Sequence, residues 1–475
     1  MVFSSSLFLL YFFPLFFITY YLTGKKFKNH VILLFSLFFY MWGAPLFLFV
    51  IGGSIILDFY LSHKIYQATG KQKKKWLIVS VCINLSILLY FKYANFFIEN
   101  FNHALISVGA TAPIRWTKIA LPIGISFFTF HELSYIIDVY RGVNKPMKRL
   151  TDYAVYILLF PQLIAGPIIR FKEIAGQILD RSYQDNMDNR LLGFFRFVIG
   201  LSKKVLIANV LGGEADKLFG IAPQDLSSGQ AWLGIIAYSF QIYFDFSGYS
   251  DMAIGMARMM GFIFPENFNN PYIAQNITDF WRRWHMSLSR WMRDYLYIPL
   301  GGNQVKSKMR LYLNLWIVFL ISGFWHGASW SFVVWGAYHG FFLIADRIFL
   351  IRFMTKIGKT FSIMFTYLIV LIGWVFFRAN TVSDAVLYIE KMFSFTTHGK
   401  LLEVDLKVQT VLFIALLVSF AAAWNKIPSI QDVILFEPYP LRRAIVFGIV
   451  SIVMLMLCTS AITSSDFNPF IYYRF

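Results

Sequence analysis

The chain has little of three things that soluble proteins use freely: charge, acidic residues and cysteine. Only 14% of its 475 residues are charged, whereas a soluble domain carries about 25%. Hydrophobic residues make up 58%, and apolar runs of about 18 residues or more, long enough to cross a bilayer core, recur along the sequence. These proportions exclude an ordinary soluble domain and indicate an integral membrane protein.

Acidic residues number 25 against 43 basic ones, which gives a net charge of +18. Excess Lys and Arg in short loops sets the orientation of membrane proteins. We therefore expect the basic groups at Lys25, Lys71–Lys75 and Arg141–Arg149 to be cytoplasmic and the N-terminus extracytoplasmic. Because no basic patch lies outside the apolar framework, nucleic-acid binding is disfavoured.

The two cysteines, Cys82 and Cys458, both lie in apolar runs. A disulfide framework or a cysteine-based metal site is therefore not expected. No two histidines have the i, i+4 spacing of a helical zinc site, and no acidic cluster accompanies His326. The sequence thus predicts no metal site.

No internal repeat and no series of short alternating segments is visible, which disfavours many transporter folds and a membrane β-barrel. Backbone groups in lipid must be paired within their own segment, so the apolar runs should be helices. We predict an all-α protein with about eleven transmembrane helices, an interfacial helix, and a re-entrant segment at Tyr153–Pro167. A single domain is expected over residues 1–475.

A basic, tryptophan-rich stretch spans residues 281–295. Its apolar residues recur at steps of three and four, which predicts one amphipathic helix at the membrane surface: Trp281, Trp284, Leu288, Trp291 and Tyr295. His285 and Ser289 would lie one turn apart on that helix. Arg282, Arg283 and Arg290 could hold phosphates of an anionic cofactor, although the stretch could equally be an interfacial anchor with His285 as a bystander.

A second stretch, Ile321–Ser331, contains Trp325 and His326 between two apolar runs. A histidine at membrane depth is costly and is a functional candidate by default. Burial keeps imidazole neutral, and neutral imidazole can act as a general base toward a hydroxyl. On the residues alone, the alternative of a hydrogen-bonded core histidine stays open.

Other polar residues in apolar segments are less informative. Asp245 and Tyr249 can share one helical face, where they would either pair with a basic group or line a polar cavity. His131, which is followed by Glu132, and His339 are interpreted as structural.

Several of these stretches together resemble the membrane-bound O-acyltransferase family, and in particular its bacterial alginate O-acetyltransferase branch. The matching segments lie mostly between residues 240 and 345 and are Tyr243–Asp251, Pro265–Pro271, Asp279–Ser289, Arg293–Tyr295 and Phe324–Gly327, with Met1–Ser5 and Asp138–Arg141 earlier in the chain. One departure is the polar pair His131–Glu132, where a less polar pair is expected.

The resemblance implies a ring of helices around a central tunnel in a bacterial inner or plasma membrane. It implies catalysis by the residues matching His326 and His285, no tightly bound cofactor, and acetyl-CoA or another acyl thioester as the donor. The final acceptor would be an extracytoplasmic polysaccharide, reached with an SGNH/esterase-like partner protein. Open alternatives are peptidoglycan O-acetylation, D-alanyl transfer to teichoic acid, and a glycan transporter or channel.

Overall fold

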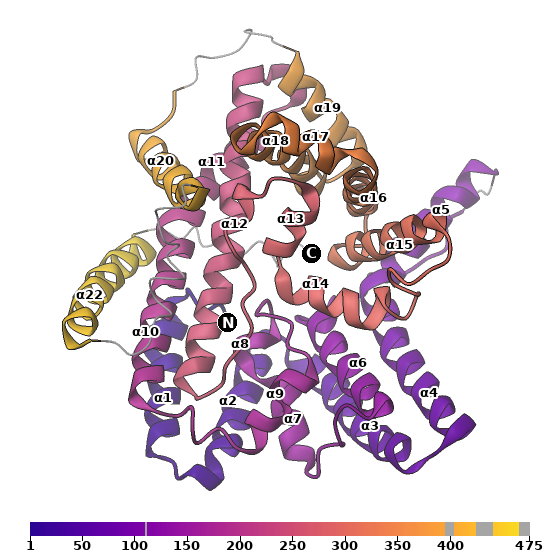
Figure 1. Ribbon diagram of the computed structural model, residues 1–475, viewed down its shortest axis with the longest axis vertical. Coiled ribbons are helices and arrows are strands. Elements are labelled where there is room, and N and C mark those ends of the chain that lie inside the picture. Colours follow the sequence, from indigo (N-terminus) through magenta and orange to yellow (C-terminus); the bar gives the residue numbers. More distant parts are fainter. Residues whose placement is uncertain (110–111, 395–402, 424–439, 465–475) are drawn as a thin grey trace. The chain divides into compact units, whose positions relative to one another are not determined.

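The computed structural model describes residues 1–109, 112–394, 403–423 and 440–464, and every regular element within these ranges is helical (Figure 1). The helices form two compact units. The first comprises Met1 and Leu10–Gln184, and the second comprises Val2–Leu9 and Asp185–Phe475. The single domain expected over residues 1–475 stays a prediction, because a division into compact units does not establish separately folding domains.

The first unit contains nine α-helices within its described residues: α1 (Phe13–Leu22), α2 (Lys28–Gly43), α3 (Leu48–Gln67), α4 (Gly70–Leu88), α5 (Ala94–Ser107), α6 (Ile125–Arg141), α7 (Leu150–Leu158), α8 (Phe160–Leu163) and α9 (Phe171–Leu179). The Tyr153–Pro167 stretch is two short helices, α7 and α8, separated at Leu159. Its backbone is broken and is buried by protein, and its re-entrant character in a membrane stays a prediction.

The second unit carries the segments that resemble the family. Its described helices are α10 (Met187–Ser202), α11 (Asn209–Phe219), α12 (Ser228–Met259), α13 (Ile277–Arg283), α14 (Met286–Met292), α15 (Lys308–His326), α16 (Trp330–Ala345), α17 (Ile351–Ile357), α18 (Lys359–Arg378), α19 (Val382–Phe393), α20 (Leu406–Phe420) and α22 (Leu441–Thr463). A π-helical turn, Arg293–Tyr297, extends α14.

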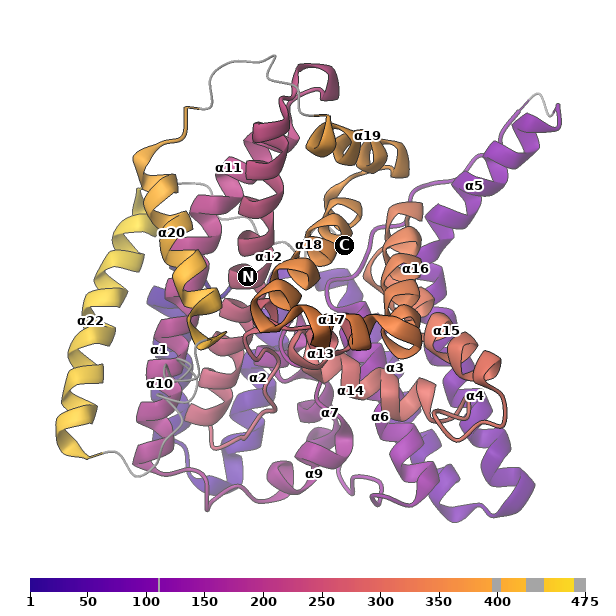
Figure 2. The same ribbon diagram turned by 45° about the horizontal axis from the view of Figure 1, so that its top comes forward.

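Helices α10 and α12 run side by side at the centre of this unit (Figures 1 and 2). Two glycine pairs bring their backbones into contact. A Cβ at Gly200 would lie 2.5 Å from the Gly248 carbonyl oxygen, and a Cβ at Gly193 would lie 2.5 Å from that of Gly255. Only glycine permits this separation.

Buried ion pairs also join α12 to its neighbours. Lys204 Nζ lies 2.7 Å from Asp245 Oδ1, and both side chains are 2% exposed. Asp251 accepts from Arg196 at 2.9 Å and from Lys203 at 2.7 Å. The pairing alternative for these aspartates therefore has direct structural support, since a buried charge is tolerated when it is paired.

Six helical segments among the described residues are long and apolar enough to cross a membrane: Pro45–Gln67, Gly70–Ser107, Trp330–Ile357, Lys359–Arg378, Leu406–Ala423 and Leu441–Thr463. Other helices, among them α6 and α12, fall outside this group. Helix α6 has 17 residues, and α12 contains Asp245 and Asp251. The larger number of about eleven stays a prediction.

The expectation of one continuous helix over residues 281–295 is wrong. Helix α13 ends at Arg283, Trp284 is extended, and His285 has φ 45° and ψ 53°, in the left-handed region. A left-handed residue cannot continue a right-handed helix. The apolar stripe is nevertheless buried as a set: Trp281, Trp284, Leu288, Trp291 and Tyr295 are each at most 8% exposed.

Candidate active site

His326 is the last residue of α15 and is 6% exposed. Three aromatic rings enclose its imidazole. The ring centroids of Trp325, Trp335 and Phe377 lie 4.9, 5.1 and 5.4 Å from that of His326, and all three rings are edge-on or nearly so. The predicted burial of His326 at the end of an apolar helix is confirmed.

Glycines allow α15 and α16 to approach closely around this histidine. A Cβ at Gly327 would collide with the ring of Phe332, and a Cβ at Gly323 would collide with the Phe332 carbonyl oxygen. Phe332 in turn packs edge-on against Phe377 at 5.0 Å. The two glycines that bracket His326 therefore let aromatic side chains close over it.

His285 lies at the junction between α13 and α14 and is 1% exposed. Phe246 of α12 stands edge-on to its imidazole at 4.7 Å. Burial lowers the pKa of His285 to about 3, so the ring is neutral at neutral pH. Only two non-glycine residues in the described part of the chain have positive φ, His285 and Asn270, and both belong to the segments that resemble the family.

The fold brings the two histidines together. The ring centroids of His285 and His326 are 6.4 Å apart, and that of Trp325 is also 6.4 Å from His285. One small bound group can therefore contact both imidazoles. Two buried imidazoles at this separation can accept and return a proton during transfer to a hydroxyl group.

Asn267 is a site residue for which the sequence suggested no role. It is 1% exposed and lies in the loop between α12 and α13. Its Oδ1 is 3.1 Å from His285 Nδ1 and accepts from the Ser287 hydroxyl at 2.8 Å. Only its place within the Pro265–Pro271 segment could have drawn attention to it.

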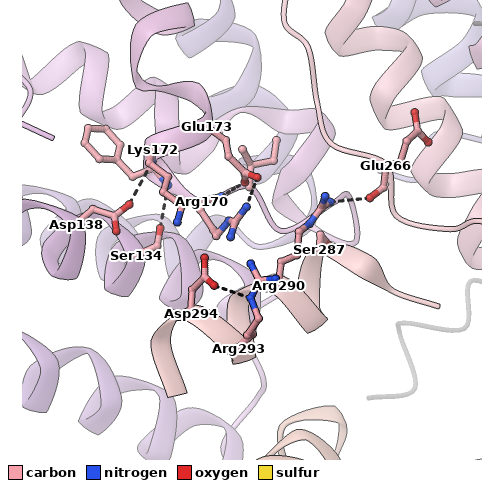
Figure 3. Close-up of polar contacts among 12 residues, drawn as sticks. Ser134, Asp138, Arg170, Lys172, Glu173, Glu266, Ser287, Arg290, Arg293 and Asp294 are labelled. Carbon is pink, nitrogen blue, oxygen red and sulfur yellow. Dashed lines mark hydrogen bonds and ion pairs between the residues drawn. The ribbon is translucent and has the colours of Figure 1, made fainter. Parts of the chain in front are cut away.

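The predicted phosphate-binding arginines have different surroundings. Arg283 pairs with Asp279 at 2.9 Å, and Arg290 donates to the Glu266 carbonyl oxygen at 2.8 Å. Figure 3 shows the Arg290 contact beside the pair of Arg293 and Asp294, 2.8 Å apart. Arg282 is exposed and has no ion pair among the described residues. Their roles toward a donor stay predictions.

The other predicted donor or substrate residues are held by protein groups. Ser289 Oγ donates to the Trp281 carbonyl oxygen at 3.1 Å, and Asp245 pairs with Lys204. Tyr249 stacks on Phe3 with centroids 4.4 Å apart. These contacts explain how the side chains are held, and a substrate-binding role for any of them stays a prediction.

His131 and His339, interpreted from the sequence as structural, are buried, and so is Glu132. In the first unit, Glu132 accepts from Ser54 Oγ at 2.6 Å, and His131 Nε2 faces the Ile169 amide at 3.4 Å. In the second unit, His339 is fully buried, with Trp281 and Trp335 edge-on at 5.1 Å.

Two buried imidazoles in an aromatic enclosure, in a chain whose described elements are all helical and include apolar spans, form a candidate general acid–base site. The sequence model described as "MBOAT, membrane-bound O-acyltransferase family" matches residues 123–382, more than half of the chain. The chain belongs to this family and is a multi-pass membrane O-acyltransferase.

Similar proteins have related names. The chain is 46% identical over 399 residues to "Probable alginate O-acetylase AlgI" of Pseudomonas aeruginosa, and the matched region covers 84% of this chain and 76% of that protein. It is 39% identical over 426 residues to "Peptidoglycan O-acetyltransferase" of Helicobacter pylori, covering 82% and 80%. It is 32% identical over 255 residues to "Teichoic acid D-alanyltransferase" of Streptococcus thermophilus, covering 51% and 61%.

Proposed function

We propose that this protein transfers acetyl groups from a cytoplasmic thioester, acetyl-CoA, toward an extracytoplasmic polysaccharide. The observation that carries the proposal is the approach of His285 and His326 to 6.4 Å inside an aromatic enclosure. The extensive similarity to the Pseudomonas protein named for alginate O-acetylation supports acetyl as the group and a polysaccharide as the final acceptor.

In the proposed reaction His326 removes the proton of the accepting hydroxyl. The hydroxyl oxygen attacks the thioester carbonyl carbon, the carbon–sulfur bond breaks, and the departing thiolate takes up a proton. The products are an ester and a free thiol, so no oxidant or reductant is needed. A positioned base of this kind contributes about 10²–10⁴-fold in rate. His285 holds the donor or the acceptor against His326.

Acetyl-CoA carries phosphates that require cationic partners. Arg283 and Arg290 already contact protein oxygens, so Arg282, exposed at the end of α13, is the predicted arginine best able to bind a donor phosphate. Arg283 and Arg290 then act mainly by holding the segments on either side of His285.

The proposal includes a topology. About eleven spans surround a central tunnel in a bacterial inner membrane, the N-terminus is extracytoplasmic, and the basic segment Lys71–Lys75 at the start of α4 is cytoplasmic. An SGNH/esterase-like partner outside the membrane receives the acetyl group, on a serine, and passes it to the polymer. Acetyl-CoA or a carrier-bound acetyl group enters from the cytoplasmic side.

A second candidate has peptidoglycan as the final acceptor, and the 39% identity to the Helicobacter protein favours it. D-alanyl transfer has the support of a similarity that covers only 51% of this chain. A glycan transporter or channel, with the histidines lining its path, is the alternative from another class.

The test is His326→Ala in cells, with acetylation and export of the polymer both measured. We expect acetylation to be lost and export to continue. His103→Ala, an exposed histidine on α5, is the matched control and should leave both unchanged. Normal acetylation by a folded, inserted His326→Ala protein would overturn the catalytic assignment. Lost export with unchanged acetylation per chain would support the transporter.

The donor has a separate test, which uses purified protein in nanodiscs with labelled acetyl-CoA. Binding or hydrolysis of the label supports acetyl-CoA, and Arg282→Gln should weaken binding while Arg352→Gln, an exposed arginine on α17, should not. If the protein accepts a carrier-bound acetyl group and does not react with acetyl-CoA, the carrier-bound group is the donor and acetyl-CoA is excluded.

A further inference from the structure

Asn267 is the most heavily hydrogen-bonded side chain beside the two histidines. Its Oδ1 faces three groups: His285 Nδ1 at 3.1 Å, the Ser287 amide nitrogen at 3.2 Å and Ser287 Oγ at 2.8 Å. Its Nδ2 donates to Ser250 Oγ of α12 at 2.9 Å. The Asn267 carbonyl oxygen also accepts from the Met286 amide at 2.9 Å. A single loop residue thus contacts His285 and the two residues that follow it in the chain.

These contacts fix which way the Asn267 amide points. A backbone N–H can only donate, so the atom that faces the Ser287 amide must be the oxygen of Asn267. An oxygen that only accepts then requires His285 Nδ1 to carry the proton, and the hydrogen bond runs from His285 to Asn267. The Nδ1–H tautomer of His285 is thus assigned from the Ser287 backbone N–H, which can only donate.

With the proton on Nδ1, a neutral His285 has its free electron pair on Nε2. This nitrogen is buried and has no hydrogen-bond partner among the described residues. Leaving a buried polar atom unsatisfied costs about 1–3 kcal/mol. The left-handed backbone of His285 adds strain, which persists only where surrounding contacts impose it. Both features point to a nitrogen kept available for a ligand.

The loop that carries Asn267 is itself anchored. Its neighbour Glu266 makes two contacts with Arg196 of α10, at 2.6 and 2.5 Å, and Arg196 also holds Asp251. Arg290 donates to the Glu266 carbonyl oxygen from the other side. Charge-assisted, bidentate contacts of this kind restrict orientation. The buried ion pairs of α10 and α12 therefore extend through Glu266 to Asn267.

We infer that Asn267 is a positioning residue that holds His285 in the Nδ1–H tautomer, so that Nε2 accepts a hydrogen bond from the reacting hydroxyl or thiol. The inference rests on the proposed function, because it assigns the atom of His285 that faces the reacting groups. Arg196 and Glu266 support it by fixing the loop. Replacement of Asn267 should alter the protonation behaviour of the reaction as well as its rate.

The test uses Asn267→Asp, Asn267→Ala and the control Asn269→Ala, an exposed residue of the same loop. Initial rates of transfer from labelled acetyl-CoA are measured in nanodiscs between pH 5 and 9. An aspartate of nearly the same shape accepts the same hydrogen bonds, but its negative charge favours the imidazolium form of His285. We expect the acid limb of the pH–rate profile of Asn267→Asp to shift to higher pH, so that activity is partly recovered at alkaline pH.

Asn267→Ala should lower kcat by about 10–100-fold, the range for losing a group that orients a functional histidine. Asn269→Ala should match the wild-type rate and profile. If Asn267→Asp folds but its profile is unmoved, and Asn267→Ala loses activity only in proportion to its folded fraction, the inference is overturned. That failure is distinct from failure of the proposed function, in which His326→Ala would retain transfer.

Discussion

The indole ring of Trp335 stands edge-on to the imidazole of His326, with ring centroids 5.1 Å apart and an interplanar angle of 86°. Trp335 also packs against Phe377 at 5.1 Å and is 1% exposed. It therefore holds the ring of His326 and that of Phe377 at the same time. An edge-on aromatic contact contributes about 0.5–1.5 kcal/mol beyond the burial of area.

Replacing Trp335 should separate packing from catalysis. Trp335→Ala leaves a cavity and should destabilise the fold by about 3–5 kcal/mol. Trp335→Phe keeps an aromatic edge near His326 and should stay folded, with transfer reduced by less than in the alanine variant. Thermal unfolding and transfer rates in nanodiscs measure both effects. Trp42→Phe, at an exposed position of α2, is the control. Equal rates for Trp335→Phe and Trp335→Ala, corrected for folded fraction, would show that the aromatic edge is irrelevant.

Variants of the Lys204–Asp245 pair can show whether Asp245 serves to pair with a cation or to bind substrate. Lys204→Met leaves a buried carboxylate without its cation and should cost about 3–5 kcal/mol of stability, whereas Lys204→Met with Asp245→Leu should recover most of that loss. Unfolding midpoints measure this cycle. An active double variant identifies Asp245 as structural. A stable but inactive double variant would instead support the substrate-binding role.

The glycine contact between α10 and α12 predicts an asymmetric response to alanine. Gly200→Ala places a Cβ 2.5 Å from the Gly248 carbonyl oxygen, and overpacking of this kind costs about 1–3 kcal/mol. Gly448→Ala, on α22, meets nothing within 4 Å and should stabilise the helix by about 0.5–1 kcal/mol. A comparison of thermal unfolding in the same detergent tests the pair. Similar effects at the two positions would contradict the close approach.

His285 predicts a dependence of stability on pH. Its pKa is about 3 in the folded protein, against 6.5 as the ordinary value. Between pH 6.5 and pH 3, His285 therefore binds a proton in the unfolded chain and stays neutral in the folded chain. The stability contribution is complete above pH 6.5 and is lost progressively as the pH falls toward 3.

The measurement compares wild type with His285→Asn, since asparagine tolerates the left-handed backbone and does not titrate. Between pH 7 and pH 5, the free energy of unfolding should fall by about 2 kcal/mol more for the wild type than for His285→Asn. Parallel curves for the two proteins would show that His285 is not buried in its neutral form.

The topology can be tested by labelling single cysteines with an impermeant maleimide in a Cys82→Ser, Cys458→Ser background. Lys74→Cys, exposed in the basic segment at the start of α4, should react only after the membrane is opened, because this segment is predicted to be cytoplasmic. Tyr183→Cys, an exposed position between α9 and α10, serves as an independent marker of labelling. Labelling of Lys74→Cys in intact cells would reverse the proposed orientation.

Periodicity in the sequence predicted the helical class and the apolar stripe from Trp281 to Tyr295, because burial of apolar side chains determines both. It could not predict the break at His285. The stripe continues across Trp284 with the same spacing, and a left-handed residue leaves no mark on the hydrophobic pattern. His285 in this conformation contacts Asn267, which lies in a different loop, and such a tertiary contact cannot be read from the local sequence.

Asn267 and Glu266 illustrate the same limit. Both stand in a polar, proline-flanked segment, and such a composition ordinarily indicates an exposed turn. The structure buries Asn267 because its donors and acceptors meet partners on α12 and α14. His326 was easier to identify because it interrupts an apolar run, where a polar residue is conspicuous without any tertiary information.

The paired glycines of α10 and α12 have a mechanical consequence. Where backbones touch, no side chain stands between them to change rotamer and absorb a sliding movement. We therefore expect α10 and α12 to move together as one rigid body. A movement of one helix relative to the other would have to break both glycine contacts, whereas the segment that carries His285 can bend at the backbone break between α13 and α14.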